Sequence, residues 1–248
     1  MLIHVPFYLI APNIKNFTFK NDLYGVNLGD KILVSSSDPI TAGGMQSGTL
    51  AIHVSCNDIA SCGIKPSGIL FVVIAPSSAT EEDIVTIVDQ ASSEVSKLGV
   101  DIVGGHTEVS DTVNDFVVIT TAFGIIDKSH PVPLGKAKAG DKLILTKKCG
   151  IEGSYIAATE HKDKISSKVS EDLIKEASEY NKLISVVPEG EIAGSIINKD
   201  FSKNDKGFYY LEKAGKLLSD AYQYEEDIIT QNLQVLMASM SLYASGQF

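Results

Sequence analysis

Apolar runs of strand length alternate with stretches of helical periodicity along this chain, and this alternation limits the fold more than any other sequence feature. Such a pattern is typical of a protein that packs helices against a sheet. The expected fold class is therefore mixed α/β. The pattern predicts strands at KILVSS (31–36), SGILFVVIA (67–75), DFVVITTAFGII (115–126) and DKLILT (141–146), with a further strand ending at Val103.

The helix with the strongest signals begins after Thr80, where T-E-E-D has the form of a capping box with three acids in the first turn. Its apolar residues recur on one face until Gly99 ends the helix. Further helices are predicted over residues 46–62, 153–160, 171–184 and 208–244.

Charge and composition limit the ligands that this chain can bind. All 21 basic residues are Lys, and 31 acidic residues bring the formal net charge to −10. An acidic chain is a poor partner for nucleic acid, because nonspecific binding to a phosphate backbone needs clustered cations. Since there is no Arg, a bound phosphate must be met by Lys, by backbone N–H groups or by a metal ion.

Neither a membrane segment nor a disulfide framework is expected. No apolar run reaches the roughly 20 residues that a membrane helix needs, and the first residues lack the basic start of a signal peptide. Cys56, Cys62 and Cys149 are an odd number of cysteines in a chain of this length. We therefore expect reduced thiols, no membrane association and a cytoplasmic location.

Two glycine-rich stretches fail the common templates for phosphate-binding loops. GGMQSGT at 43–49 has the glycine spacing of a Walker A loop, but Thr49 stands where that loop needs its Lys. GGHTE at 104–108 lacks the spacing of a dinucleotide-binding GxGxxG motif. Local motifs alone therefore establish no nucleotide site.

Acidic residues at the ends of apolar segments are more informative. Asp22 precedes the first strand region, Asp38 follows KILVSS, and Asp58 lies within a predicted helix. Glu108 follows the strand that ends at Val103. Carboxylates of this kind can converge on one hard cation, and Mg²⁺ on nucleotide phosphates needs only one or two of them. Each acid taken singly is more typical of a solvated turn or a helix cap.

His106 and Glu108 would share one face of an extended strand. One interpretation is a zinc-dependent hydrolase that uses both residues with a Cys. The alternative, a hydrogen-bonded structural histidine, is favoured because no Cys-x-x-Cys or His-x-x-x-His set accompanies them. Cys56 and Cys62 are interpreted as small buried apolar residues.

Three blocks, SSSDPIT (35–41), AIHVSCNDIASCGIKP (51–66) and DIVGGHTEV (101–109), together resemble the aminoimidazole ribonucleotide (AIR) synthetase-like superfamily. Its members include thiamine monophosphate kinase, selenophosphate synthetase and a hydrogenase maturation protein, and the resemblance points nearest to the hydrogenase maturation branch. Residues 131–161 likewise resemble the start of the superfamily's second domain.

The resemblance implies an N-terminal ATP-binding domain over residues 1–130, with a mixed sheet that pairs with a second subunit in a barrel-like homodimer. It implies a C-terminal α/β domain over 131–248, truncated or divergent after about residue 195. The cofactors would be ATP and Mg²⁺. By match to the superfamily motifs, Mg²⁺ would be held by Asp22, Asp38 and Asp58, and the nucleotide or its phosphates by Asn57, Gly104, Gly105, His106, Thr107 and Glu108.

The hypothesis that follows is an ATP-using protein that phosphorylates a small substrate or acts in a maturation pathway with a partner protein. If it is an enzyme, it is of the phosphoryl-transfer or ligase type. Two departures from the superfamily favour an alternative, a non-catalytic dimeric relative: no Gly precedes Gly25 where relatives carry a Gly-rich lid, and the C-terminal-domain motif is not found after residue 195.

Overall fold

The computed structural model describes residues 24–128 and 145–197. These residues belong to two units. The first comprises residues 24–128 together with 185–194, so it is discontinuous in sequence, and the second comprises 145–184 with 195–197. Asp22 and the predicted helix 208–244 lie outside the described residues, as do residues 141–144 of a predicted strand, whose remaining two residues are not in a strand.

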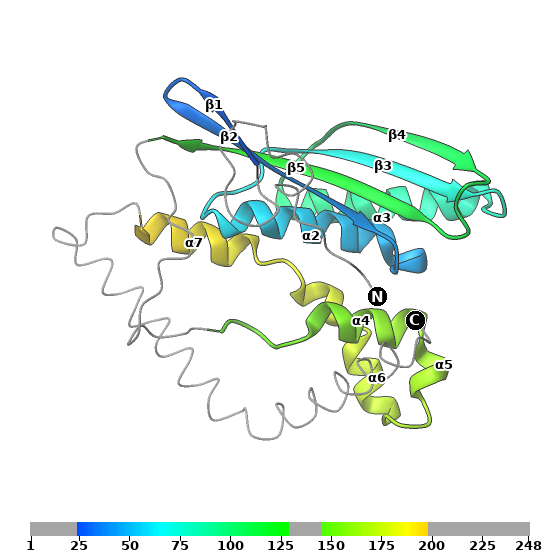
Figure 1. Cartoon of the computed structure of the whole chain (residues 1–248). Coiled ribbons are helices and arrows are strands. Elements are labelled where there is room, and N and C mark those ends of the chain that lie inside the picture. The colour runs from blue at the N-terminus through cyan, green and yellow to red at the C-terminus, as the bar shows by residue number, and fades with distance from the viewer. Residues whose placement is uncertain (1–23, 129–144, 198–248) are drawn as a thin grey trace, which may run out of the picture. The chain divides into compact units, whose positions relative to one another are not determined.

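A five-stranded mixed sheet forms the first unit, which confirms the expected fold class (Figure 1). Its order is β1-β2-β5-β3-β4, and every neighbouring pair is antiparallel except β3 with β4. The parallel pair is joined by a helix, as parallel neighbours require. The strands are β1 (Tyr24–Leu28), β2 (Lys31–Ile40), β3 (Gly68–Pro76), β4 (Ile102–Ser110) and β5 (Val117–Asp127).

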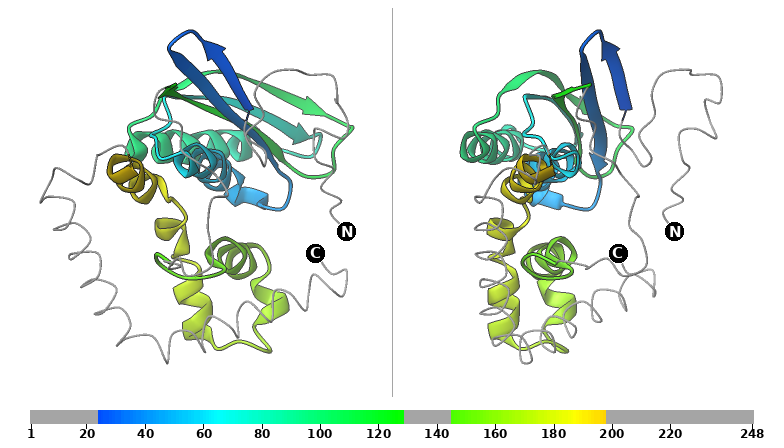
Figure 2. Two further views of the ribbon diagram at one scale, coloured as in Figure 1. Left: turned by 60° about the vertical axis from the view of Figure 1, so that its left-hand side comes forward. Right: turned by 90° about the vertical axis from the view of Figure 1, so that its left-hand side faces the viewer.

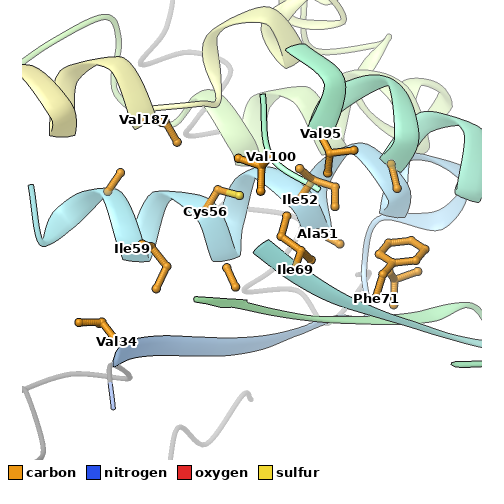
Figure 3. Packing of buried hydrophobic residues seen from close by; sticks show 14 of the residues in the cluster. Val34, Ala51, Ile52, Cys56, Ile59, Ile69, Phe71, Val95, Val100 and Val187 are labelled. Carbon is orange, nitrogen blue, oxygen red and sulfur yellow. The ribbon is translucent and has the colours of Figure 1, made fainter. Parts of the chain in front are cut away.

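Two helices, α2 (Ser47–Ser61) and α3 (Glu81–Leu98), lie on the same side of this sheet (Figures 1 and 2). A short 3₁₀ turn, η1 (Gly44–Gln46), precedes α2. Strands β2 and β5 alternate buried and more exposed residues, and the buried set faces the helices. Figure 3 shows the resulting core, in which side chains of α2 meet those of β2, β3 and α3.

The capping signals read from the sequence are confirmed in α3. Asp83 N–H donates to Thr80 Oγ1 (3.2 Å), while Thr80 N–H donates to Asp83 Oδ2 (2.9 Å). The Thr80 hydroxyl also donates to Asp83 Oδ2 (2.7 Å), and the bonds from Thr80 N–H and from this hydroxyl hold the pKa of the Asp83 carboxyl below its usual value. At the other end Gly99 adopts the left-handed conformation, with φ of 60°, that closes a helix.

A buried histidine–glutamate pair joins the two helices. His53 Nε2 of α2 lies 3.2 Å from Glu94 Oε2 of α3, with side-chain exposures of 4% and 9%. The other carboxylate oxygen of Glu94 accepts from Lys97 Nζ at 2.7 Å. Glu94 is therefore buried with two partners, which is the usual condition for a charged group inside a protein.

Residues 185–194 pack against the C-terminal end of α2. The helix α7 (Val187–Ile197) begins there, and Val187 joins the core (Figure 3). Two glycines four residues apart allow the close approach: a Cβ at Gly190 would collide with the carbonyl of Ala60, and one at Gly194 with that of Gly63. The sequence analysis did not predict this helix.

The second unit is helical in its described part, with α4 (Ile151–Glu160), α5 (Lys162–Ile165), α6 (Glu171–Ala177) and η2 (Tyr180–Leu183). The prediction of one helix over 171–184 is wrong beyond Ala177. Tyr180 is buried there and its hydroxyl bonds Glu176 (3.0 Å), while Lys148 bonds both residues. These contacts join η2 to α6 and to Lys148. No helix among the described residues is both long and apolar enough to span a membrane.

Candidate functional site

Asp38 and Asp58 come together on the covered side of the sheet. The alternation of β2 buries Ile32, Val34 and Ser36 under the helices, and Asp38 follows in the same phase. Asp58 belongs to the last turns of α2, which crosses above β2. Both aspartates are partly buried. Asp38 and Asp58, the two predicted metal ligands that the structure describes, therefore lie close together.

The hydroxyl of Ser36 connects the two carboxylates. Ser36 Oγ donates to Asp58 Oδ2 at 2.6 Å and lies 3.3 Å from Asp38 Oδ2. Ser36 itself is only 1% exposed. This serine lies within the block SSSDPIT, and it is not among the site residues predicted from the sequence. No sequence signal marks it, because Ser36 and Asp58 are 22 residues apart and on different elements.

Two carboxylates around a buried hydroxyl offer the hard oxygen ligands that Mg²⁺ prefers. Among residues 24–128 and 145–197, no group of three or more His, Cys, Asp or Glu side chains could hold a metal ion by itself. Two protein carboxylates do fit a magnesium ion that is also bound by nucleotide phosphates and water, because such ions take few ligands from the protein. The third predicted ligand, Asp22, lies outside the described residues.

The glycine block lies on β4, the edge strand, and not beside Asp38. In the sheet, Asp38 pairs with Thr120, Thr120 with Phe71, and Phe71 with Gly105. Three inter-strand steps of about 4.8 Å therefore put roughly 14 Å between the backbones of Asp38 and Gly105. The structure does not bring the predicted phosphate-binding block and the predicted metal ligands together within one chain.

Residues 102–110 form a continuous strand, so the expectation of a strand that ends at Val103 is wrong. Gly104, Gly105 and Thr107 are strand residues paired with β3. Gly105 is required there by close packing, since a Cβ would collide with the carbonyl of Phe71. The Gly-Gly pair and the polar residues that follow it carry no strand periodicity, which explains why the sequence did not predict this extension.

His106 and Glu108 lie on the opposite face from the aspartates. They pair with Val72 and Ile74 of β3, which alternate with the residues buried under the helices. His106 Nε2 is 3.2 Å from Glu108 Oε2, and the two side chains are 62% and 51% exposed. The prediction that they share one face of a strand is confirmed.

The cysteines do not complete a zinc site with this pair. In the described part of the chain, Cys56 and Cys62 are buried and free, while His106 and Glu108 are exposed on the other side of the sheet. Burial raises the pKa of the Cys56 thiol to about 12 and also raises that of Cys62. Neutral thiols are poor zinc ligands and poor nucleophiles, because the thiolate is the reactive form.

Asn57, predicted to contact the nucleotide, holds the segment that follows the second unit. Its side-chain oxygen accepts a hydrogen bond from Val186 N–H at 2.7 Å. This bond spans 129 residues and attaches the segment that begins at Ser185 to α2, at the residue before Asp58. No sequence spacing could have predicted it.

Residues 22–126 match the family model described as AIR synthase related protein, N-terminal domain. The matched range contains α2, α3, the Ser36 site and the five strands except the last residue of β5. These residues are therefore similar to the N-terminal domain of AIR synthase related proteins. The resemblance expected from the three sequence blocks is confirmed over this range.

Curated proteins with two different names resemble this chain. A Methanocaldococcus jannaschii protein named for hydrogenase expression/formation is 29% identical over 174 residues, covering 68% of this chain and 51% of the relative. Thiamine-monophosphate kinase of Methanospirillum hungatei is 30% identical over 146 residues, covering 56% and 49%. The chain thus spans about half the length of these relatives.

Solved structures show the same fold. AaThiL complexed with AMPPCP and TMP superposes with a TM-score of 0.61 at 15% identity, covering 77% of this chain and 61% of that one. Thiamine monophosphate kinase from Aquifex aeolicus gives 0.58 at 14% identity, covering 76% and 63%. At such identities the likeness extends to the fold alone.

Proposed function

We propose that this protein binds ATP with Mg²⁺ in its first unit and uses the nucleotide to phosphorylate and activate a small molecule. The observation that carries the proposal is the joining of Asp38 and Asp58 through Ser36. Relatives named as a kinase and as a selenide, water dikinase support phosphoryl transfer as the chemistry. A solved relative complexed with AMPPCP supports a nucleotide as the ligand.

Each residue of the proposed site has a defined task. Asp38 and Asp58 hold the metal, with Asp22 as the third proposed ligand. Bound magnesium would neutralise charge on the phosphates, which is the main requirement of phosphoryl transfer. Because the chain has no Arg, the remaining positive charge must come from Lys side chains and backbone N–H groups.

Asn57 and the stretch Gly104 to Glu108 stay proposed nucleotide contacts on the strength of the family resemblance. The distance between β4 and Asp38 implies that this stretch contacts a different part of the nucleotide, or the nucleotide of a partner subunit. All three cysteines of the chain are free, in keeping with the proposed cytoplasmic location.

We also propose that the protein is a homodimer that pairs through the uncovered face of the sheet. That face carries exposed large apolar side chains where a solvated sheet would carry polar ones. Light scattering should give the mass of two chains, and the mass of one chain would contradict this part. The exposed apolar residues on that face are Val26, Leu28, Leu70, Val103 and Ile125.

The decisive experiment is calorimetric titration with MgATP. Asp38→Asn and Asp58→Asn should each weaken binding by roughly 100-fold, about 2.7 kcal/mol, because each removes a metal ligand. Asp89→Asn is the matched control, since Asp89 is an exposed acid of α3 outside the site. Absence of any binding heat with the wild-type protein would contradict the proposal.

Turnover distinguishes the proposed enzyme from the non-catalytic relative. An ATPase rate above background that Asp58→Asn abolishes would support the enzyme. Tight MgATP binding without hydrolysis, in the presence or absence of candidate acceptors, would support the non-catalytic dimer. The acceptor, whether a small molecule or a maturation partner protein, can be sought by mass spectrometry of co-purified ligands.

A further inference from the structure

Ser36 differs from Ser55, another buried serine of the covered layer, in the charge of its partners. Ser55 Oγ bonds the hydroxyl of Thr120 at 2.5 Å and its carbonyl at 3.2 Å, both neutral groups that join α2 to β5. Ser36 Oγ instead faces two carboxylates, from β2 and from α2. Both serines are at most 1% exposed.

The geometry assigns the single proton of Ser36 to Asp58. At 2.6 Å the contact has the short length of a hydrogen bond from a hydroxyl to an ionised carboxylate, whereas 3.3 Å to Asp38 lies at the long end. A carboxylate has two oxygens, so Asp58 can be held by Ser36 through one and still bind a cation through the other.

Two nearby carboxylates repel each other when no cation lies between them. Without a donor between them, their side chains would rotate apart and would have to be ordered again each time a cation bound. The Ser36 hydroxyl is buried in the sheet, so it cannot follow such a rotation. It therefore holds the ligands in place before the cation arrives.

We propose that Ser36 is a positioning residue that pre-orders Asp58 and Asp38 for the divalent cation. This inference rests on the proposed function, since it concerns the same site. It goes further by naming a residue that touches neither nucleotide nor metal and yet sets the affinity for the metal. Groups that orient metal ligands typically change metal affinity by about 10- to 100-fold when removed.

The test compares Ser36→Ala with Ser55→Ala. Each substitution removes one buried hydroxyl from the same layer, but only the first removes it from the carboxylates. Binding of Mn²⁺ alone is measured by electron paramagnetic resonance, and binding of ATP by calorimetry with Mg²⁺ and with EDTA. Thermal melting of both variants establishes that they are folded.

For Ser36→Ala we expect Mn²⁺ and MgATP to bind roughly 10- to 100-fold more weakly, with unchanged affinity for ATP in EDTA. Ser55→Ala should bind all three as the wild type does. Ser36→Thr, which keeps the hydroxyl, should restore most of the Mn²⁺ affinity. Equal losses in Ser36→Ala and Ser55→Ala, or none in Ser36→Ala, would overturn the inference.

The test of Ser36 and the test of the proposed function can fail independently. A wild-type protein that binds Mn²⁺ but no ATP would contradict the proposed function, while the Mn²⁺ comparison would still decide the role of Ser36. A wild-type protein that binds neither Mn²⁺ nor MgATP would contradict both.

Discussion

The helical layer and the edge strand β4 each carry a histidine–glutamate pair, and in both pairs Nε2 lies 3.2 Å from Oε2. His53 and Glu94 have side chains that are less than 10% exposed, whereas those of His106 and Glu108 are more than 50% exposed. The same distance therefore occurs once in the protein interior and once on an exposed surface. We expect burial, and not distance, to decide how much each contact contributes to stability.

The same contrast separates the two groups of predicted site residues. Asp38 and Asp58 are partly buried and linked through the buried hydroxyl of Ser36. His106 and Glu108 contact each other on an exposed strand surface. A binding site needs groups that are already ordered, as Asp38 and Asp58 are, because ordering flexible groups at the moment of binding costs affinity.

The largest expected effect comes from breaking the buried pair. Glu94→Ala should lower the free energy of unfolding by about 3 kcal/mol, because it leaves a buried His53 without this acceptor and Lys97 without its partner. Chemical denaturation measures the loss. Glu94→Gln, which keeps the shape and one oxygen, should lose less, and an equal loss would mean that the charge is irrelevant.

A second test asks whether close packing against Phe71 makes a glycine necessary at position 105 of β4. Gly105→Ala should destabilise the first unit by about 2 kcal/mol, because the added Cβ collides with the Phe71 carbonyl. Gly104→Ala is the control, since its Cβ would meet only the side chain of Leu70, at 3.3 Å. Urea denaturation of the two variants should give clearly different midpoints. Indistinguishable midpoints would refute the packing role of Gly105.

The smallest effect is expected for the exposed pair. Glu108→Ala should change the free energy of unfolding by less than about 0.5 kcal/mol, because exposed ion pairs gain little and are screened by salt. Melting curves at low and high salt provide the measurement. This small effect assumes that the subunit contact proposed for this face leaves the His106–Glu108 pair exposed. A loss near that of Glu94→Ala would instead show that the proposed contact includes this part of β4.

Much of the first unit could be predicted from the sequence because its signals are local. The capping residues of α3 lie three positions apart, and the buried strands show as apolar runs. The edge strand β4 is predicted from the sequence only as far as Val103, since it is exposed along most of its length and has no apolar alternation. Likewise, no signal in the sequence marks the end of α6 at Ala177.

The candidate site was predictable in its residue types but not in its assembly. Family blocks identified Asp38 and Asp58, yet the serine that joins them was passed over, since its role depends on a strand and a helix meeting in space. Asn57 was assigned to the nucleotide, while its observed hydrogen bond is to Val186, 129 residues along the chain. Contacts between residues so far apart in the chain produce no recognisable pattern in the sequence.

The discontinuous first unit has a consequence for synthesis. Val187, Gly190 and Gly194 pack against α2, although more than 120 residues separate them from that helix in the order of translation. The sheet and its two helices leave the ribosome long before this last element of their own core. Until Gly194 has emerged, the nascent chain must keep the end of α2 uncovered, beside the acid on which the proposed nucleotide site depends.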